Sequence, residues 1–356
     1  MADRNILFKI VLAVFLLGTA QLANAKIASG GGEDGFNPGT FILEHIGDAY
    51  DWHILSYNGH HVSVPLPVII YSKDLGFNVF MSSKFHHGHD PYKGFKIASE
   101  GAHKGKIVYE NRPGERPMLD ISITKNALSL FVSVVIFLWV FLSVAKTYMR
   151  RGNQAPKGLQ SWVEPVILFV RDDIARPAIG HRYKSYLPYL LTLFFFILIN
   201  NIMGLIPFFP FGANVTGNIA ITLILALITF IITTCSANKS YWAHIFNSPG
   251  VPIWLKIPIP LMPIVELMGV FIKPFVLMIR LFANITAGHI IVIGFFCLIF
   301  LFGNMHPALG YGVSIFSVAF TVFMGFLELL VAFIQAYVFT LLSALYFGMA
   351  KPEEHH

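Results

Sequence analysis

Long apolar runs separated by short polar loops dominate the chain from residue 128 onward. A helix needs about 20 apolar residues to cross the roughly 30 Å hydrocarbon core of a bilayer. Runs that can meet this requirement cover residues 128–145, 186–206, 218–234, 258–302 and 309–350. The pattern therefore predicts an all-α polytopic membrane protein with five transmembrane helices.

The last two apolar runs are too long for upright helices. At 1.5 Å per residue, about 45 helical residues measure roughly 65 Å, more than twice the hydrocarbon thickness. We expect a steeply inclined hairpin of two long helices, with a kink at Pro274 and a helix start set by Pro258, Pro260 and Pro263. An inclined hairpin of this kind usually packs against a curved surface, so we expect a partner protein with such a surface.

Two further segments have a different pattern. Residues 162–184 mix apolar clusters with charges, which predicts an amphipathic helix lying on the membrane interface rather than crossing the bilayer. Residues 26–125 contain alternating apolar and polar positions, as in HHVSVPLPVIIYS, with frequent Gly and Pro. This alternation predicts a small β-containing region outside the membrane.

The N-terminus has the pattern of a cleavable signal peptide. Arg4 and Lys9 precede an apolar run, and Ala23-Asn24-Ala25 forms a small-residue cleavage site, so the mature chain is expected to begin at Lys26. The alternative is an additional membrane anchor. The predicted organisation is a signal peptide (1–25), an outer-side region (26–125), a transmembrane domain (126–350) and a cytoplasmic tail (351–356).

Charge in the loops gives an independent prediction of topology. The loop after the first predicted span carries several Lys and Arg residues, and the third loop carries Lys239 and Lys256. The intervening loops, FFPFGANVTG and GNMHPALG, carry none. Because basic loops stay in the cytoplasm, the N-terminus is predicted to lie outside (in the periplasm) and the C-terminus inside.

Composition excludes several classes of protein. The chain is 55% hydrophobic and 12% charged, against about 25% charged for a soluble domain. The net charge of +6 does not indicate a nucleic-acid partner, because most basic residues lie in loops beside apolar runs. Cys235 and Cys297 form no CxxC pair, and no GxxxxGK[ST] phosphate-binding loop occurs. No cofactor is predicted.

Histidines in the outer-side region are a candidate metal site. The best group is His86, His87 and His89, since imidazole is a common metal ligand. The region lacks cysteines and its carboxylates are irregularly placed. We therefore favour solvated loop histidines over a metal site.

Ionisable residues inside the last two predicted helices are few and regularly spaced. Glu266, Lys273 and Arg280 are seven residues apart and share one helical stripe, which Asn284 extends. His289 falls on the opposite face. In the last helix, Glu328 and Gln335 are again seven apart. A charge in mid-bilayer costs at least about 2.5–3.5 kcal/mol, so each of these residues is a candidate functional residue.

These residue types suit proton transfer. Arg280 stays charged at physiological pH, so it can repel a cation or stabilise a carboxylate without giving up a proton. Glu and His can carry protons. Structural alternatives remain open: Glu266 and Lys273 could pair or extend to the inner interface, and His289 could be a helix–helix contact. Arg280, in the interior of an apolar run with no acid within one turn, is the strongest functional candidate.

Three motifs carry a resemblance to a known family. IRLFANITAGH (279–289), LLVAFIQAYVFTLLSALYFGMA (329–350) and NNIMGLIP (200–207) resemble, in order, motifs of the membrane-embedded stator subunit a of F-type ATP synthases. The resemblance covers residues 128–350. The outer-side region is longer and richer in His than the usual N-terminus of this family.

The resemblance implies a role for each matched residue. Arg280 would face the rotating ring of c subunits, with Asn284 and Gln335 as polar neighbours. Glu266 would belong to the inner half-channel, near Lys273, and His289 and Glu328 would form the acid–histidine pair of the outer half-channel. The implied protein is a non-catalytic, proton-translocating stator of the bacterial inner membrane, bound to the c ring and to peripheral-stalk b subunits.

Two other functions could use an ionisable residue inside the membrane. A secondary transporter could use an intramembrane Arg to bind an anionic substrate, but neither an internal repeat nor midplane-broken helices are visible in the sequence. A membrane-embedded metalloenzyme would need an HExxH-like pair within a span, and only His289 lies deep in a predicted helix. His289, which can carry a proton, favours H⁺ over Na⁺ as the coupling ion.

Overall fold

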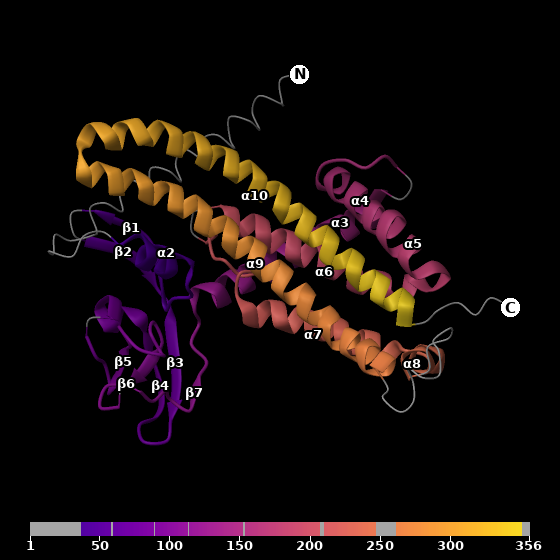
Figure 1. The fold of residues 1–356 in the computed structure, drawn as a ribbon, viewed down its shortest axis with the longest axis horizontal. Coiled ribbons are helices and arrows are strands. Elements are labelled where there is room, and N and C mark those ends of the chain that lie inside the picture. Colours follow the sequence, from indigo (N-terminus) through magenta and orange to yellow (C-terminus); the bar gives the residue numbers. More distant parts are fainter. Residues whose placement is uncertain are drawn as a thin grey trace. The chain divides into compact units, whose positions relative to one another are not determined.

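The computed structural model describes residues 37–57, 60–88, 90–112, 114–151, 154–206, 210–246 and 261–350. The predicted signal peptide (1–25) and tail (351–356) lie outside the described residues. The described residues fall into two compact units, one lying within residues 1–132, 203–215 and 288–327, and the other within residues 133–202, 216–287 and 328–356. The elements of both units are labelled in Figure 1.

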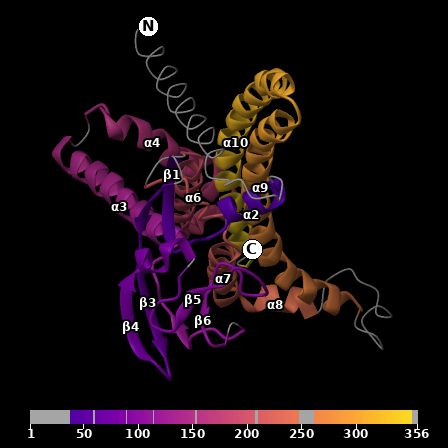
Figure 2. The same cartoon turned by 90° about the vertical axis from the view of Figure 1, so that its left-hand side faces the viewer.

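The first unit contains the predicted β region. Helix α2 (Pro38–Ile46) precedes the hairpin of β1 (Asp51–Tyr57) and β2 (His60–Pro65). A three-stranded sheet follows, ordered β4-β3-β7, and β5 pairs with β6. The remaining bounds are β3 (Pro67–Ser72), β4 (Gly76–Met81), η2 (Ser82–Gly88), β5 (Phe95–Ile97), β6 (Ile107–Tyr109) and β7 (Leu119–Asp120). The small N-terminal β region is therefore confirmed, and Figure 2 shows β3 and β4 as a long hairpin.

Alternation along β3 builds the core of this region. Val68 and Ile70 point inward and are fully buried, because successive side chains of a strand face opposite sides. They pack with the buried side chains of Tyr50, Phe85, Phe95 and Ile107. The alternating pattern read from the sequence at HHVSVPLPVIIYS thus corresponds to β2 and β3.

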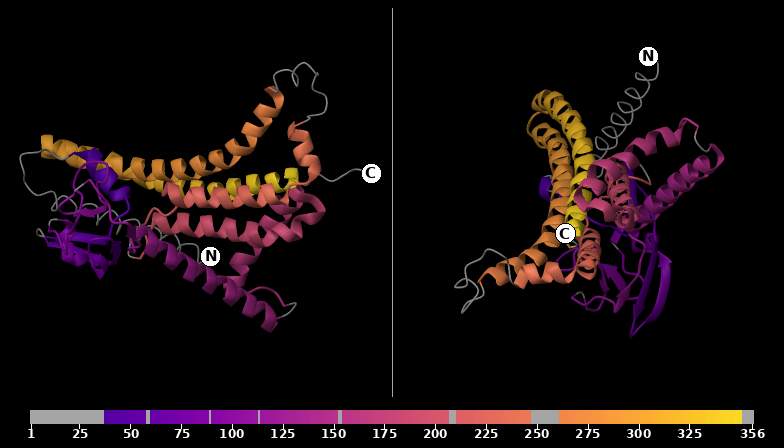
Figure 3. Two further views of the ribbon diagram at one scale, coloured as in Figure 1. Left: turned by 90° about the horizontal axis from the view of Figure 1, so that it is seen from below. Right: turned by 90° about the vertical axis from the view of Figure 1, so that its right-hand side faces the viewer.

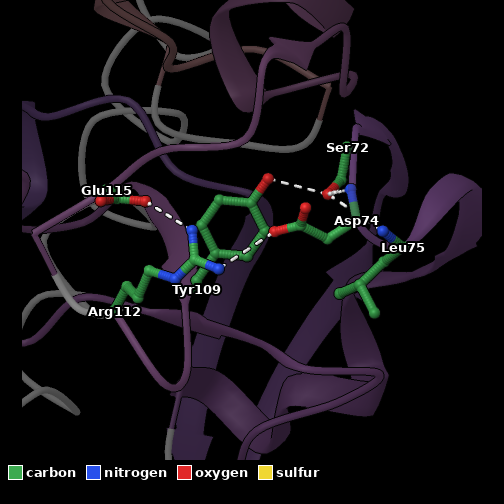
Figure 4. A network of polar contacts seen from close by, with 6 residues as sticks. All are labelled: Ser72, Asp74, Leu75, Tyr109, Arg112 and Glu115. Atoms are coloured by element: carbon green, nitrogen blue, oxygen red, sulfur yellow. Dashed lines mark hydrogen bonds and ion pairs between the residues drawn. The ribbon is translucent and has the colours of Figure 1, made fainter.

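A polar network holds the β3–β4 turn (Figure 4). The hydroxyls of Ser72 and Tyr109 are hydrogen-bonded at 2.8 Å, and Arg112 pairs with Asp74 at 3.3 Å and with Glu115 at 3.1 Å. All three charged side chains are more than half exposed. Because exposed ion pairs contribute little to stability, the network orients the turn more than it stabilises the fold.

The described residues contain five helical segments long and apolar enough to cross a membrane. They are α3 (Lys125–Arg151), a segment ending in α6 (Tyr183–Leu205), α7 (Ile219–Ser236), α9 (Leu261–Met305) and α10 (Pro307–Ala350). The five predicted spans are confirmed within a few residues. A short helix, α8 (Lys239–Phe246), was not predicted.

Residues 162–184 are helical, as predicted, but they do not form one regular helix. Helix α4 (Leu159–Phe169) is followed by a π-helical turn, η3 (Val170–Ala175), then α5 (Arg176–Ile179) and the 3₁₀ turn η4 (Gly180–Arg182). Gly180 has φ 75°, which ends α5. Val170, Ile174 and Ala175 are buried, so this segment is anchored in the core by its apolar side.

The core of the second unit packs α4, η3 and α5 with α6, α7, α9 and α10. Its fully buried side chains include Ile174, Leu190, Phe194, Leu281 and Phe347. At Gly348 of α10, a Cβ atom would collide with the carbonyl oxygen of Ala178 in α5. A glycine is therefore required where these two helices approach so closely.

Helices α9 and α10 form the predicted hairpin. Helix α9 continues through Pro274 as one helix of 45 residues, and α10 has 44 residues, so each is about 65 Å long. Near the turn, Gly310 approaches Gly303 so closely that an added Cβ would lie 2.7 Å from its Cα. The rings of Phe295 and Phe320 stack at 5.3 Å. Figures 1 and 3 show the two helices side by side over residues 288–327.

Candidate functional site

Arg280 lies on the outside of the described chain, not in its interior. Leu277, Leu281 and Ile285 of α9 are buried against the core, and Arg280 and Asn284 lie on a different, exposed side of the same helix. The residues next to Arg280 in the sequence are apolar, as predicted. The folded subunit nevertheless leaves the side chain of Arg280 exposed. A cation in this position can reach a group outside the chain.

Lys273 faces α10 instead. Its Nζ atom lies 5.5 Å from the centre of the Tyr346 ring, which is a cation–π contact. Both residues line a cavity of about 20 Å³ between α7, α8, α9 and α10, large enough for roughly one water molecule. Thr229, Thr233 and Tyr241 add hydroxyl groups to its wall. The rest of the lining is mostly apolar, with Phe230, Val270 and Leu277 among the residues that form it.

Glu266 lies seven residues before Lys273 on α9, and its side chain is half-buried. The pKa of the Tyr241 hydroxyl on α8 is raised, first by burial and further by the negative charge of Glu266. Glu266, Lys273 and Arg280 are seven residues apart along the uninterrupted helix α9, and Asn284 follows Arg280 by four residues, as expected from the sequence.

Gln335 is buried on α10, and sequence reasoning missed the polar contacts that lie one turn before it. The Nδ2 atom of Asn201 on α6 donates to the carbonyl oxygen of Ala332 at 3.2 Å. The Oγ1 atom of Thr216 donates to Oδ1 of Asn201 at 2.7 Å. An amide inside an apolar run was the only signal that could have indicated this contact.

His289 lies beside the NNIMGLIP segment. A Cβ atom at Gly204 would lie 3.7 Å from Nε2 of His289 and 3.4 Å from the carbonyl oxygen of Ala213. Gly204 and His289 are 85 residues apart in the sequence, so the two motifs that contain them lie side by side at this glycine. Glu328 belongs to the other compact unit, where it is half-buried on α10, seven residues before Gln335.

Comparison with known proteins identifies the family. Residues 127–348 match the family model described as ATP synthase A chain. ATP synthase subunit a of Chloroherpeton thalassium is 43% identical over 243 residues, which are 67% of this chain and 69% of that protein. The chain belongs to the ATP synthase subunit a family.

Other members of the subunit a family are similarly close. ATP synthase subunit a 2 of Chlorobaculum tepidum is 44% identical over 238 residues, 65% of this chain and 64% of that protein. Subunit a of Myxococcus xanthus is 41% identical over 248 residues, 67% of this chain and 76% of that protein. Family membership and the five apolar helical segments together make this chain a multi-pass membrane protein.

The N-terminal region matches a separate model. Residues 41–128 match a domain of unknown function, DUF8433. Within the described residues no group of three or more His, Cys, Asp or Glu side chains could hold a metal ion. His89 and the side chain of His87 lie outside the described residues, so the interpretation of His86, His87 and His89 as solvated loop histidines stays a prediction.

Proposed function

We propose that this chain is the proton-translocating stator subunit of a rotary F-type ATP synthase. The observation that carries the proposal is the exposed position of Arg280 on an apolar helix of a chain in the subunit a family. A guanidinium facing lipid would cost at least about 2.5–3.5 kcal/mol. A partner that presents a carboxylate removes this cost and gives the charge a function.

The partner of Arg280 in this proposal is the ring of c subunits. Arg280 stays protonated at physiological pH, so it attracts an ionised ring carboxylate but does not itself pass on the proton. Each carboxylate must therefore release its proton on one side of Arg280 and take up another on the other side. Peripheral-stalk b subunits hold the chain stationary while the ring turns. Asn284 is the polar neighbour of Arg280 on the exposed face of α9.

Two half-channels supply and remove the protons in this account. We assign Glu266 and Lys273 to the inner half-channel, and the cavity beside Lys273 supports this assignment because it has room for about one water molecule next to the ammonium group. We assign His289 and Glu328 to the outer half-channel as residues able to exchange protons. Gln335 is a polar neighbour of the path on α10.

The proposed setting follows from topology. The chain lies in the bacterial inner membrane with its N-terminus in the periplasm and its C-terminus in the cytoplasm, as the distribution of Lys and Arg among the loops predicts. The chain is not catalytic by itself in this account. ATP chemistry belongs to other subunits of the complex.

Purification from native membranes tests this proposal against the secondary transporter. A tagged chain should copurify with a ring of small hairpin subunits and with ATP-hydrolysing subunits. A monomer that moves an anionic solute across proteoliposome membranes, with no bound ring, would refute the proposal. The same preparation without the tag controls for non-specific capture.

A further inference from the structure

One face of the three-stranded sheet in the N-terminal region is apolar and exposed. Its opposite face packs on the core of the region through Val68 and Ile70. The side chains on the exposed face, each 43–67% exposed, are those of Tyr71, Phe77, Val79, Met81, Leu119 and Ile121. We call these six residues the outer sheet face. Exposed apolar patches of this kind mark places where a protein binds a partner or a membrane.

The register of the strands makes the outer sheet face one continuous patch. Tyr71 of β3 lies opposite Leu119 of β7. Two residues earlier on β3, Ile69 lies opposite Val79 of β4, and its carbonyl oxygen accepts a hydrogen bond from the backbone N–H of Ile121 at 3.0 Å. Residues that lie opposite one another on neighbouring strands have side chains in contact on the same face. The patch therefore runs across all three strands.

The sheet leads directly into a membrane-spanning helix. Strand β7 ends at Asp120 and α3 begins at Lys125, so the chain between them covers at most about 17 Å. Within this stretch the backbone N–H of Ile123 still donates to the carbonyl oxygen of Pro67 on β3, at 3.0 Å. The sheet and the first turns of α3 also belong to the same compact unit. The outer sheet face is therefore held near the surface of the bilayer that α3 enters.

Basic side chains stand at both ends of the β3–β4 hairpin. Lys73 lies in its turn and Lys84 lies just after β4, and both are exposed. The nearby carboxylate of Asp74 is paired with Arg112 at 3.3 Å. Ammonium groups beside an apolar patch suit a phospholipid surface, where phosphate groups lie directly above acyl chains. Tyr71 adds an amphipathic ring of the kind that is enriched at membrane–water interfaces.

We propose that the outer sheet face lies on the phospholipid bilayer beside α3, with its apolar side chains inserted among the lipid headgroups. The region that matches a domain of unknown function is then a peripheral membrane domain of this chain. Its covalent link to α3 keeps the bilayer at a high effective concentration, so a weak intrinsic affinity is enough. A protein partner has to be recruited, whereas the bilayer accompanies every copy. The inference goes beyond the proposed function, because it requires only that α3 cross the membrane.

Photo-crosslinking to lipid tests the contact in the unsubstituted protein. The full chain is reconstituted in vesicles of phosphatidylethanolamine and phosphatidylglycerol that contain a phospholipid with a diazirine near the glycerol end of one acyl chain. Trypsin cuts after Lys73 and Lys84, so β4 is released in one peptide, residues 74–84. The control is the tryptic peptide 97–104, which includes the turn between β5 and β6.

The peptide that contains β4 should carry at least about fivefold more lipid adduct than the control peptide, because side chains at an interface reach about 5–10 Å into the boundary of headgroups and acyl chains. Equal amounts of adduct on the two peptides, or no adduct on the β4 peptide, would overturn the proposal.

Substitutions on the outer sheet face test whether its apolar side chains make the contact. The double variant Phe77→Glu, Val79→Glu places two charges on the face and leaves the core residues of β3 unchanged. It should lose most of the lipid adduct on the β4 peptide. Ala102→Glu, at an exposed position of the β5–β6 turn, is the matched control and should keep the adduct. Undiminished adduct in the double variant would contradict insertion of this face.

A fluorescent label separates lipid from water and from a protein partner. In a chain with Cys235 and Cys297 replaced by Ala, a nitrobenzoxadiazole group on Val79→Cys should be quenched by doxyl-labelled lipid and not by iodide in solution. The same group on Ala102→Cys should show the reverse. Quenching of the Val79→Cys label by iodide would mean a solvated face, and quenching by neither agent would mean a face covered by protein, and either result would overturn the proposal. None of these readouts depends on proton transport, so they stand or fall separately from the proposed function.

Discussion

The amide of Asn201 on α6 binds the carbonyl oxygen of Ala332 on α10 across 131 residues of sequence, at 3.2 Å. Thr216 completes the contact by donating to the other end of the same amide. The contact lies one turn before Gln335 and fixes α6 against the C-terminal half of α10. It connects the NNIMGLIP segment to the second of the two long helices.

Replacing Asn201 with Leu should destabilise this packing. The variant loses both hydrogen bonds and leaves the hydroxyl of Thr216 without its acceptor, so we expect a cost of about 1–2 kcal/mol. The thermal unfolding midpoint of the purified complex measures the effect. Asn200→Leu is the matched control, since in the described part of the chain Nδ2 of Asn200 donates to the carbonyl oxygen of Phe196 within its own helix. A larger loss in the control would contradict the proposed importance of the long-range contact.

Replacing Gly348 with Ala should disrupt the approach of α5 to α10. The added methyl group collides with the backbone of Ala178, which cannot move aside as a side-chain tip can. We expect a cost of about 1–3 kcal/mol and a lower yield of assembled subunit, measured by quantitative blotting of membranes. Gly312→Ala in the same helix has nothing within 4 Å of the new atom and should assemble normally. Equal yields of the two variants would argue against this crossing.

A double-mutant cycle should detect coupling between Lys273 and Tyr346. The ammonium group lies over the ring, so the variants Lys273→Met and Tyr346→Leu should be non-additive by about 0.5–2 kcal/mol. The readout is the thermal midpoint of the complex, and Lys273→Arg should retain most of the coupling. Additive losses would show that the two side chains do not interact in the assembled protein.

The buried hydroxyl of Tyr50 should make the N-terminal region sensitive to alkali. Burial, together with the hydrogen bond to Asp120, raises the pKa of this hydroxyl above its ordinary value of 10.0. A raised pKa in the folded state contributes stability that is complete below pH 10 and is lost as the pH rises through the folded value. Tyr50→Phe should cost about 1 kcal/mol at neutral pH and should flatten the alkaline loss.

Hydrogen-exchange protection of β3 and β7 in the intact complex, corrected for intrinsic rates, measures the effect at Tyr50. Tyr71→Phe provides a comparison at a partly exposed tyrosine of the same sheet. An identical alkaline loss of protection in Tyr50→Phe and in the unsubstituted protein would exclude Tyr50 as its source.

An exchange variant tests the proposed outer pair. The double variant His289→Glu, Glu328→His keeps one imidazole and one carboxylate, so we expect it to retain more proton-driven ATP synthesis than His289→Ala or Glu328→Ala. Synthesis rates in energised membrane vesicles measure this. Equal losses in all three variants would argue that the two residues do not act as a pair.

Much of the membrane fold followed from the sequence because apolar length and loop charge are local properties. The five spans and the long hairpin were predicted, since no long-range contact is needed to recognise an apolar run. The π-helical turn at Val170–Ala175 was missed, because burial of Val170 and Ile174 in the core overrides the regular helical pattern. Helix α8 has only eight residues, which is too short a window for a helical pattern to be recognised, and it was also missed.

The sequence predicted which residues belong to the candidate site, but not which side chains surround them. Seven-residue spacing placed Glu266, Lys273 and Arg280 on one stripe, and α9 keeps that spacing. Spacing could not show that Lys273 faces Tyr346 while Arg280 is exposed, because this depends on how α9 is rotated against α10. Contacts such as Asn201 with Ala332 arise from tertiary packing and leave no periodic signal.

The most direct test of the central claim is proton-driven ATP synthesis by the variant Arg280→Ala in membrane vesicles. Gly269→Ala on the same helix, where nothing lies within 4 Å of an added Cβ atom, is the control for a substitution on α9. Our account predicts that Arg280→Ala assembles with the c ring but makes no ATP, while Gly269→Ala retains substantial synthesis. Normal synthesis by assembled Arg280→Ala complexes would contradict the account.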